Sequence, residues 1–141
     1  MILPDVNVLL YAFRPDSADH DKHRHWLQTV VEVGDPYGMS PQVLASVVRI
    51  STHPRIFKSP TPAREALAFS SLLLAQPHCC VVTPGPRHWS IFERICKHSG
   101  AQGNLIQDAW FAALAMESGA EWITTDRDYA RFEGLRWRLP F

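Results

Sequence analysis

The sequence predicts an α/β domain in which helices cover both faces of a parallel sheet. Short apolar segments such as 2–5 and 122–125 alternate with longer segments whose apolar residues recur at helical spacing. This alternation is typical of βαβ units, in which a helix connects two parallel strands. At 141 residues, of which 46% are hydrophobic, the chain is long enough for one domain and short for two. We therefore expect a single domain over residues 1–141.

The first half of the chain supplies a strand and three helical segments. Residues 2–5 form a short buried strand in this interpretation, and helices are expected over 6–13 and about 20–33. Pro41 favours the start of a further helix, because the first turn does not need the N–H that proline lacks. Pro54 ends that helix, since proline cannot continue the hydrogen-bond ladder.

The second half continues the alternation of strands and helices. Helices are predicted over residues 65–76, 87–99 and 104–118, with a short helix over 126–132. Strands are predicted over residues 79–83 and 122–125, and an edge strand over 135–139. The long apolar helix after residue 104 is expected to stop at Gly119.

Charge is balanced overall but unevenly distributed. The formal net charge is zero, so the whole chain gives no electrostatic argument for nucleic-acid binding. Between Asp35 and Glu93 the only acid is Glu65. The basic residues of the same stretch are Arg49, Arg55, Lys58, Arg64 and Arg87. This surface is either locally basic or an ordinary solvated face with scattered arginines.

The cysteines and the apolar segments indicate a cellular compartment. Cys79, Cys80 and Cys96 lack metal or redox spacing, and we expect them to be reduced packing residues. No segment reaches the roughly 18 apolar residues of a membrane helix. Asp5 interrupts the N-terminal apolar run, which argues against a signal peptide. The sequence therefore predicts a cytoplasmic protein without a membrane partner.

Three aspartates stand at the edges of apolar segments. Asp5 and Asp126 follow predicted strands, and Asp108 lies in the first turns of the helix that starts near Asn104. The carboxyl ends of parallel strands meet at one edge of the sheet, which this helix terminus can also reach. Clustered acids repel, and Mg²⁺ or Mn²⁺ would relieve that repulsion with oxygen ligands. The pattern favours metal-dependent hydrolysis of a phosphodiester.

Each aspartate also has an ordinary structural interpretation. Asp5 is placed to cap a helix, and Asp108 is placed to interact with a helix dipole. Asp126 or Asp128 is placed to form an Asx turn. The coincidence of three acids at the predicted edges of one sheet favours the metal site.

Three motifs together resemble those of PIN-domain ribonucleases. Pro4–Phe13 resembles the opening motif of that family, and Gly103–Ala109 resembles the segment around its third acid. Thr124–Tyr129, followed by Phe132, resembles its closing motif. The motifs stand in the right order, and the resemblance covers essentially the whole chain. It is closest to the VapC toxins of bacterial and archaeal toxin–antitoxin pairs.

This resemblance implies a PIN-like three-layer α/β/α sandwich with a parallel sheet of four to five strands. It also implies the toxin of a type II toxin–antitoxin system that cleaves RNA, often tRNA or ribosomal RNA, as a Mg²⁺- or Mn²⁺-dependent endoribonuclease. The implied partners are a VapB-type antitoxin and a second copy of the chain in a homodimer.

The resemblance also assigns roles to residues. It implies that Asp5, Asp108 and Asp126 are the catalytic, metal-binding acids. The residues expected to support them are Asn7, Thr125 and Asp128. Apart from the resemblance, the sequence offers Arg14, Arg49 and Arg55 as candidates for contacts with RNA, and Arg49 is equally placed to form a surface ion pair.

The chain departs from the family at the second acid. The helix that follows Ser40 holds Ser46 at the matching position, and no Asp or Glu lies within that helix. The loss of one acid would favour one bound metal over two and would weaken metal binding.

The sequence leaves two other functions open. The first is a PIN-like module that binds RNA or an antitoxin without cleaving RNA, because Ser46 replaces the second acid. The second is a phosphoryl-transfer or receiver-like domain, which also places acids at strand ends. That domain needs a lysine near the acids, and Lys22, Lys58 and Lys97 all lie away from the predicted strand ends.

Overall fold

The computed structural model describes all residues, 1–141, and every strand pairing in it is parallel. The five strands are β1 (Ile2–Pro4), β2 (Tyr37–Met39), β3 (Cys79–Val81), β4 (Glu121–Ile123) and β5 (Trp137–Arg138). Hydrogen bonds join them in two groups, β1-β4-β5 and β2-β3. The prediction of a parallel sheet is confirmed, although its hydrogen bonds are interrupted between the two groups.

The two groups of strands meet where β2 lies beside β1. Gly38 in β2 faces β1, and a Cβ atom on this residue would lie 3.2 Å from the carbonyl oxygen of Ile2 and 3.0 Å from Cγ2 of Val82. Glycine therefore permits the close approach of the two strands. The order of strands in space is β3-β2-β1-β4-β5.

Replacement of Gly38 by valine should destabilise the protein. The added side chain would displace either β1 or Val82, and overpacking of this kind costs about 1–3 kcal/mol in the free energy of unfolding. Urea denaturation measures this change. An unchanged unfolding midpoint would show that β1 and β2 can separate without cost.

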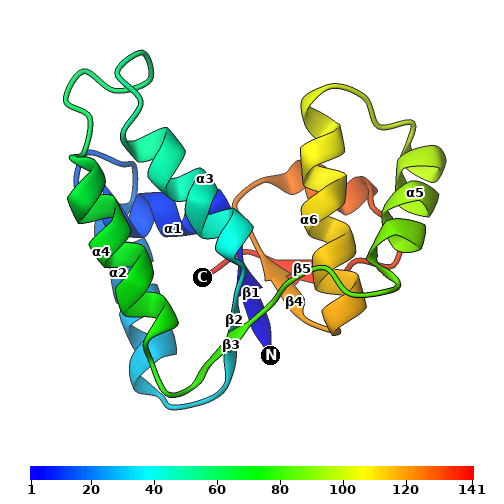
Figure 1. Cartoon of the computed structure of the whole chain (residues 1–141), viewed down its shortest axis with the longest axis horizontal. Helices are drawn as coiled ribbons and strands as arrows, with labels where there is room; N and C mark the ends of the chain where they lie inside the picture. Colours follow the sequence, from blue (N-terminus) through cyan, green and yellow to red (C-terminus); the bar gives the residue numbers. More distant parts are fainter.

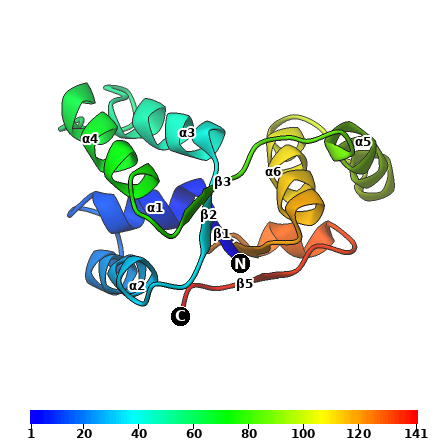
Figure 2. The same ribbon diagram turned by 60° about the horizontal axis from the view of Figure 1, so that its bottom comes forward.

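Helices cover both faces of the strands. The helices are α1 (Val6–Phe13), α2 (His20–Glu32), α3 (Pro41–Ser51), α4 (Ala63–Leu74), α5 (His88–Ser99), α6 (Asn104–Ser118) and the 3₁₀ helix η1 (Arg127–Arg131). Helices α1 to α4 gather on one side of the strands, and α5 and α6 lie on the other (Figure 1, Figure 2). The predicted three-layer sandwich is confirmed. The short helix expected after Asp126 is a 3₁₀ helix.

Local sequence signals explain several helix ends. Pro41 is the first residue of α3, where its missing N–H costs nothing. Helices α5 and α6 end at Gly100 and Gly119, whose φ angles of 66° and 68° are left-handed. All three cysteines are free, but Cys80 is exposed, whereas sequence analysis expected it to be packed.

The core fixes the carboxyl edge of the sheet. Leu3, Trp122 and Ile123 are fully buried, and α6 packs a buried apolar run, Phe111–Ala115, into the same interior. Dense packing of this kind allows little movement of β1 and β4, so the residues that follow these strands are held firmly. None of the helices combines the length and the apolarity that crossing a membrane requires.

Candidate active site

Asp5 is the first residue after β1 and caps α1. Its Oδ1 atom accepts a hydrogen bond from the Val6 N–H at 2.6 Å. Its Oδ2 atom accepts hydrogen bonds from the Thr124 hydroxyl at 2.6 Å and from the Asn7 side-chain amide at 3.0 Å. The Asp5 side chain is therefore buried among donors that hold both carboxylate oxygens in place.

The surroundings of Asp5 raise its pKa. Burial, the largest cause, raises this pKa from 3.8 to about 7. Hydrogen bonds from Thr124 and Val6 oppose the rise, whereas the negative charges of Asp108 and Asp126 add to it. The three predicted acids thus interact across the site.

Thr124 connects two of these acids. Its hydroxyl donates to Asp5 and accepts the N–H of Asp126 at 3.0 Å. Asp126 in turn caps η1, because its Oδ1 atom accepts the N–H of Asp128 at 2.8 Å. This chain of hydrogen bonds fixes the turn after β4 against the turn after β1.

Asp108 reaches the site from α6. The hydroxyl of Tyr129 lies 3.4 Å from its Oδ1 atom and donates to it. Burial and the nearby charge of Asp126 both raise the pKa of Asp108. Tyr129 is itself buried, and burial together with the surrounding carboxylates raises the pKa of its phenol. Tyr129 therefore stays a neutral hydrogen-bond donor.

All three aspartates line one cavity of about 270 Å³. Its other polar lining residues are Asn7, Tyr11, Ser46, Arg49 and Gln107. Ser46 projects from α3, and its hydroxyl is already bonded to the Gln42 carbonyl at 3.1 Å. The position where the family resemblance expects a second acid therefore does face the cavity, but it carries no charge.

The supporting residues differ in detail from those that sequence analysis named. The hydroxyl that touches the acids belongs to Thr124, whereas Thr125 donates only its main-chain N–H, to Asn7 Oδ1 at 3.3 Å. Asn7 therefore bridges Asp5 and the turn after β4, as a supporting residue would. Asp128 is exposed and pairs with Arg131 at 3.3 Å. Sequence reasoning missed Thr124 and Tyr129, although both lie in the closing motif.

The three arginine candidates for RNA contact have different surroundings. Arg49 lines the acid cavity, and Arg55 is exposed in the connection between α3 and α4. Arg14 is only 4% exposed, and its guanidinium is bonded to the main chain of Ser51 and Ser59. The structure therefore removes Arg14 from the residues that can touch a phosphate.

The acids suit a hard divalent cation at an open site. No three acidic, imidazole or thiol side chains stand at the spacing of a closed metal centre. However, Mg²⁺ binds few protein ligands directly and keeps several waters, for which a cavity of about 270 Å³ has room. The residues that would hold Mg²⁺ or Mn²⁺ are Asp5, Asp108 and Asp126.

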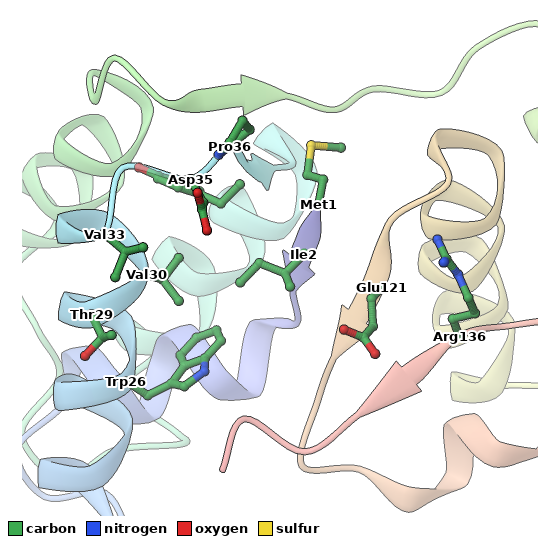
Figure 3. Close-up of a pocket in the computed structure, with 11 residues that line it drawn as sticks. Met1, Ile2, Trp26, Thr29, Val30, Val33, Asp35, Pro36, Glu121 and Arg136 are labelled. Atoms are coloured by element: carbon green, nitrogen blue, oxygen red, sulfur yellow. The ribbon is translucent and has the colours of Figure 1, made fainter.

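A second cavity, of about 460 Å³, lies at the opposite edge of the sheet. Figure 3 shows Trp26 and Val30 on α2 facing Ile2 of β1, with Glu121 and Arg136 across the opening. This cavity is larger than the one at the carboxyl edge, but none of the three predicted acids lines it. Cavity volume alone therefore does not identify a functional site in this protein.

The raised pKa of Asp5 predicts a pH dependence of stability in the presence of chelator. The folded protein holds this proton up to about pH 7, whereas the unfolded chain loses it near 3.8, so stability falls as the pH rises through that window. The full effect is about 4 kcal/mol. Urea denaturation at several pH values measures this effect in the wild type and in Asp5→Asn. The difference between their free energies of unfolding should change by this amount across the window. Parallel stability curves would contradict the prediction.

The matches of this chain to known sequences agree on one protein family. Residues 2–135 match the PIN domain family. Over 140 residues the chain is 41% identical to ribonuclease VapC43 and 40% identical to ribonuclease VapC25, both of Mycobacterium tuberculosis. The alignments cover 99% of this chain, and 95% and 99% of the respective relatives.

Solved structures share the fold. VapBC2 from Rickettsia felis, bound to a DNA fragment of its promoter, gives a TM-score of 0.72 at 17% identity and covers 99% of this chain and 98% of that one. VapC20 of Mycobacterium tuberculosis, described as a toxin that cleaves the sarcin–ricin loop, gives 0.65 at 16% identity, with coverage of 92% and 93%. At such identities the likeness is one of fold.

Proposed function

Because this chain belongs to the VapC branch of the PIN-domain family, we propose that it is a toxin that cleaves RNA as a Mg²⁺- or Mn²⁺-dependent endoribonuclease. The observation that carries the proposal is the single cavity lined by Asp5, Asp108 and Asp126. The family match also removes the receiver-like alternative.

The proposed roles follow from the contacts of each residue. Thr124 and Asn7 hold the Asp5 carboxylate in one orientation, and Tyr129 does the same for Asp108. A bound divalent ion would supply positive charge for the phosphodiester and would activate water for attack. Burial, and to a smaller extent the charges of the neighbouring acids, make the ionised forms of Asp5 and Asp108 unfavourable, and a bound divalent ion would offset that cost.

The binding-only alternative has weaker support. Only one acid of the family pattern is missing, at Ser46, and the three that remain converge on one cavity. The curated relatives of similar length are named ribonucleases. We therefore place cleavage ahead of binding alone.

The proposed partners rest on the same relatives. Two solved structures of this fold are of VapBC proteins, VapBC2 and VapBC-1, which supports a VapB-type antitoxin as the partner of this chain. The proposed RNA substrate is tRNA or ribosomal RNA, and one structural neighbour is described as cleaving the sarcin–ricin loop. We further propose that the toxin acts in the cytoplasm as a homodimer.

The first test is cleavage of total cellular RNA by the purified protein. We expect discrete fragments with Mg²⁺ or Mn²⁺, none with chelator and none with Asp5→Ala, since cleavage needs both the ion and its ligand. Sequencing of the fragment ends would identify the RNA target. Fragments that persist in chelator or with Asp5→Ala would contradict the proposed site. RNA that binds without being cleaved under either metal would favour the binding module.

A further inference from the structure

A loop over residues 52–62 joins α3 to α4 and projects beyond the outer ends of both helices (Figure 1). It contains the three prolines Pro54, Pro60 and Pro62, which restrict its backbone. Its base is closed by a hydrogen bond from the Thr61 N–H to the Ser51 carbonyl at 2.8 Å. The loop therefore has a defined shape of its own, with its two ends close together.

Arg14, which follows the last residue of α1, is inserted into this loop. Its guanidinium donates hydrogen bonds to the carbonyls of Ser51 at 3.4 Å and Ser59 at 3.1 Å, and to the Thr61 hydroxyl at 3.0 Å. Its Cζ atom also lies 3.6 Å from the centre of the Phe57 ring. The Arg14 side chain thus contacts the loop at its base, at its second half and at its one aromatic residue.

Arg14 is the only tether of this kind. All hydrogen bonds that reach residues 52–62 from outside α3, α4 and the loop itself come from its guanidinium. Its charge is paired with Asp16 at 2.7 Å, and the hydrogen bond from Arg14 lowers the pKa of that carboxyl. Asp16 is largely exposed, so the pair does little to offset the burial of the guanidinium. The hydrogen bonds of the guanidinium hold the loop in a fixed position relative to α1.

The loop follows α3, the helix that lines one side of the acid cavity without contributing an acid. Residues 36–64 contain no Asp or Glu, and their cations are Arg49, Arg55, Lys58 and Arg64. Arg49 and Ile50 line the cavity, and the loop begins two residues after Ile50. Arg55 and Lys58 are exposed and form no ion pair within the protein.

This charge distribution matters for a polyanionic substrate. Asp5, Asp108 and Asp126 repel the phosphates of RNA on either side of the bond to be cleaved. An RNA chain that enters the cavity therefore gains most where its backbone continues along a surface of free cations. Helix α3 places Arg49 in the cavity with the acids, and the loop that follows α3 carries the further cations Arg55 and Lys58.

Building on the proposed ribonuclease function, we propose that the 52–62 loop binds the RNA backbone beside the acid cavity. Arg55 and Lys58 contact phosphates in this arrangement, and Arg14 is the positioning residue that holds the loop without touching RNA itself.

The test is the salt dependence of binding to a labelled single-stranded RNA oligonucleotide of mixed sequence, measured in chelator to prevent cleavage. Loss of both loop cations in Arg55→Gln/Lys58→Gln should weaken binding about tenfold and reduce the slope of log affinity against log salt by about 1.4. Arg14→Met should reproduce most of this loss, although its buried guanidinium cannot contact the RNA. The triple variant should bind no more weakly than the double variant, since both changes act on the same contacts.

Controls separate positioning from general damage. Arg24→Gln removes an exposed cation from α2 and should keep the wild-type slope. Thr61→Val removes one acceptor of Arg14 with little change in shape and should give a smaller loss in the same direction, which covers the case in which Arg14→Met does not fold. Urea denaturation of each variant shows whether it is folded.

Two results would overturn the proposal. A folded Arg14→Met or Thr61→Val protein with the wild-type salt slope would make Arg14 a purely structural residue. A wild-type slope in the double variant would show that RNA does not lie on the loop. Cleavage of cellular RNA by the same wild-type preparation is recorded separately. If the wild type cleaves RNA and all variants keep the wild-type salt slope, only the role of the loop is disproved. If the wild type does not cleave RNA with either metal, the result counts against the ribonuclease function.

Discussion

Asp108→Asn should abolish RNA cleavage while leaving the protein folded. The substitution removes one negative charge from the cavity but keeps an oxygen that can accept the Tyr129 hydrogen bond. We expect the cleavage rate with Mg²⁺ to fall by about a thousandfold, because a charged group at the reacting centre is lost. Single-turnover cleavage of the identified RNA target measures this rate.

The same variant should be at least as stable as the wild type in chelator. Burial and the charge of Asp126 raise the pKa of Asp108, so the ionised form is unfavourable in the folded protein and its removal relieves that cost. Asp21→Asn, an exposed change on α2, is the matched control and should keep full activity. Cleavage by Asp108→Asn at the wild-type rate would exclude this carboxylate from the reaction.

Ser46→Glu should strengthen metal binding. The position lines the acid cavity, and glutamate is well tolerated within a helix such as α3. A fourth carboxylate adds attraction for a divalent ion, and we expect about tenfold tighter Mn²⁺ binding, equivalent to about 1.4 kcal/mol. Calorimetric titration measures the affinity, and cleavage at limiting Mn²⁺ should rise with it.

Ser46→Gln provides the control for this prediction. It has nearly the shape of glutamate but no charge, so it should bind Mn²⁺ no more tightly than the wild type. In chelator, Ser46→Glu should be less stable than Ser46→Gln, since a fourth acid increases the repulsion in the cavity. Equal Mn²⁺ affinities for the two variants would show that α3 does not contribute to the ion-binding side of the cavity.

Much of the fold was accessible from the sequence because its signals are local. Pro41 and Gly119 marked helix boundaries correctly, since each acts through its own backbone. Asp5 directly follows β1 as predicted, whereas β4 ends at Ile123 and Asp126 lies three residues beyond it. Both acids still lie at the same edge of the sheet, because β1 and β4 are parallel. Strand β2 and the interruption of the sheet between β1 and β2 were not predicted, since the pairing of strands far apart in the chain depends on tertiary contacts.

Arg14 shows where local patterns mislead. In the sequence it is a lone cation after a helix, and such residues are usually exposed. Its burial depends on the path of a loop that begins 38 positions later, at residue 52. The chain offers no periodicity from which that path can be derived.

The sequence by itself determined the order of the helices and of four of the five strands. It also indicated the three acids and the position of Ser46, where the family resemblance expects a fourth. The tertiary structure decided which groups donate hydrogen bonds to those acids. Pro4 pairs with Ile123, and continuing this register by one residue puts Thr124, rather than Thr125, beside Asp5. The physical reason is that the two residues are 119 positions apart, so their contact is set by strand pairing and by the core that holds β1 against β4.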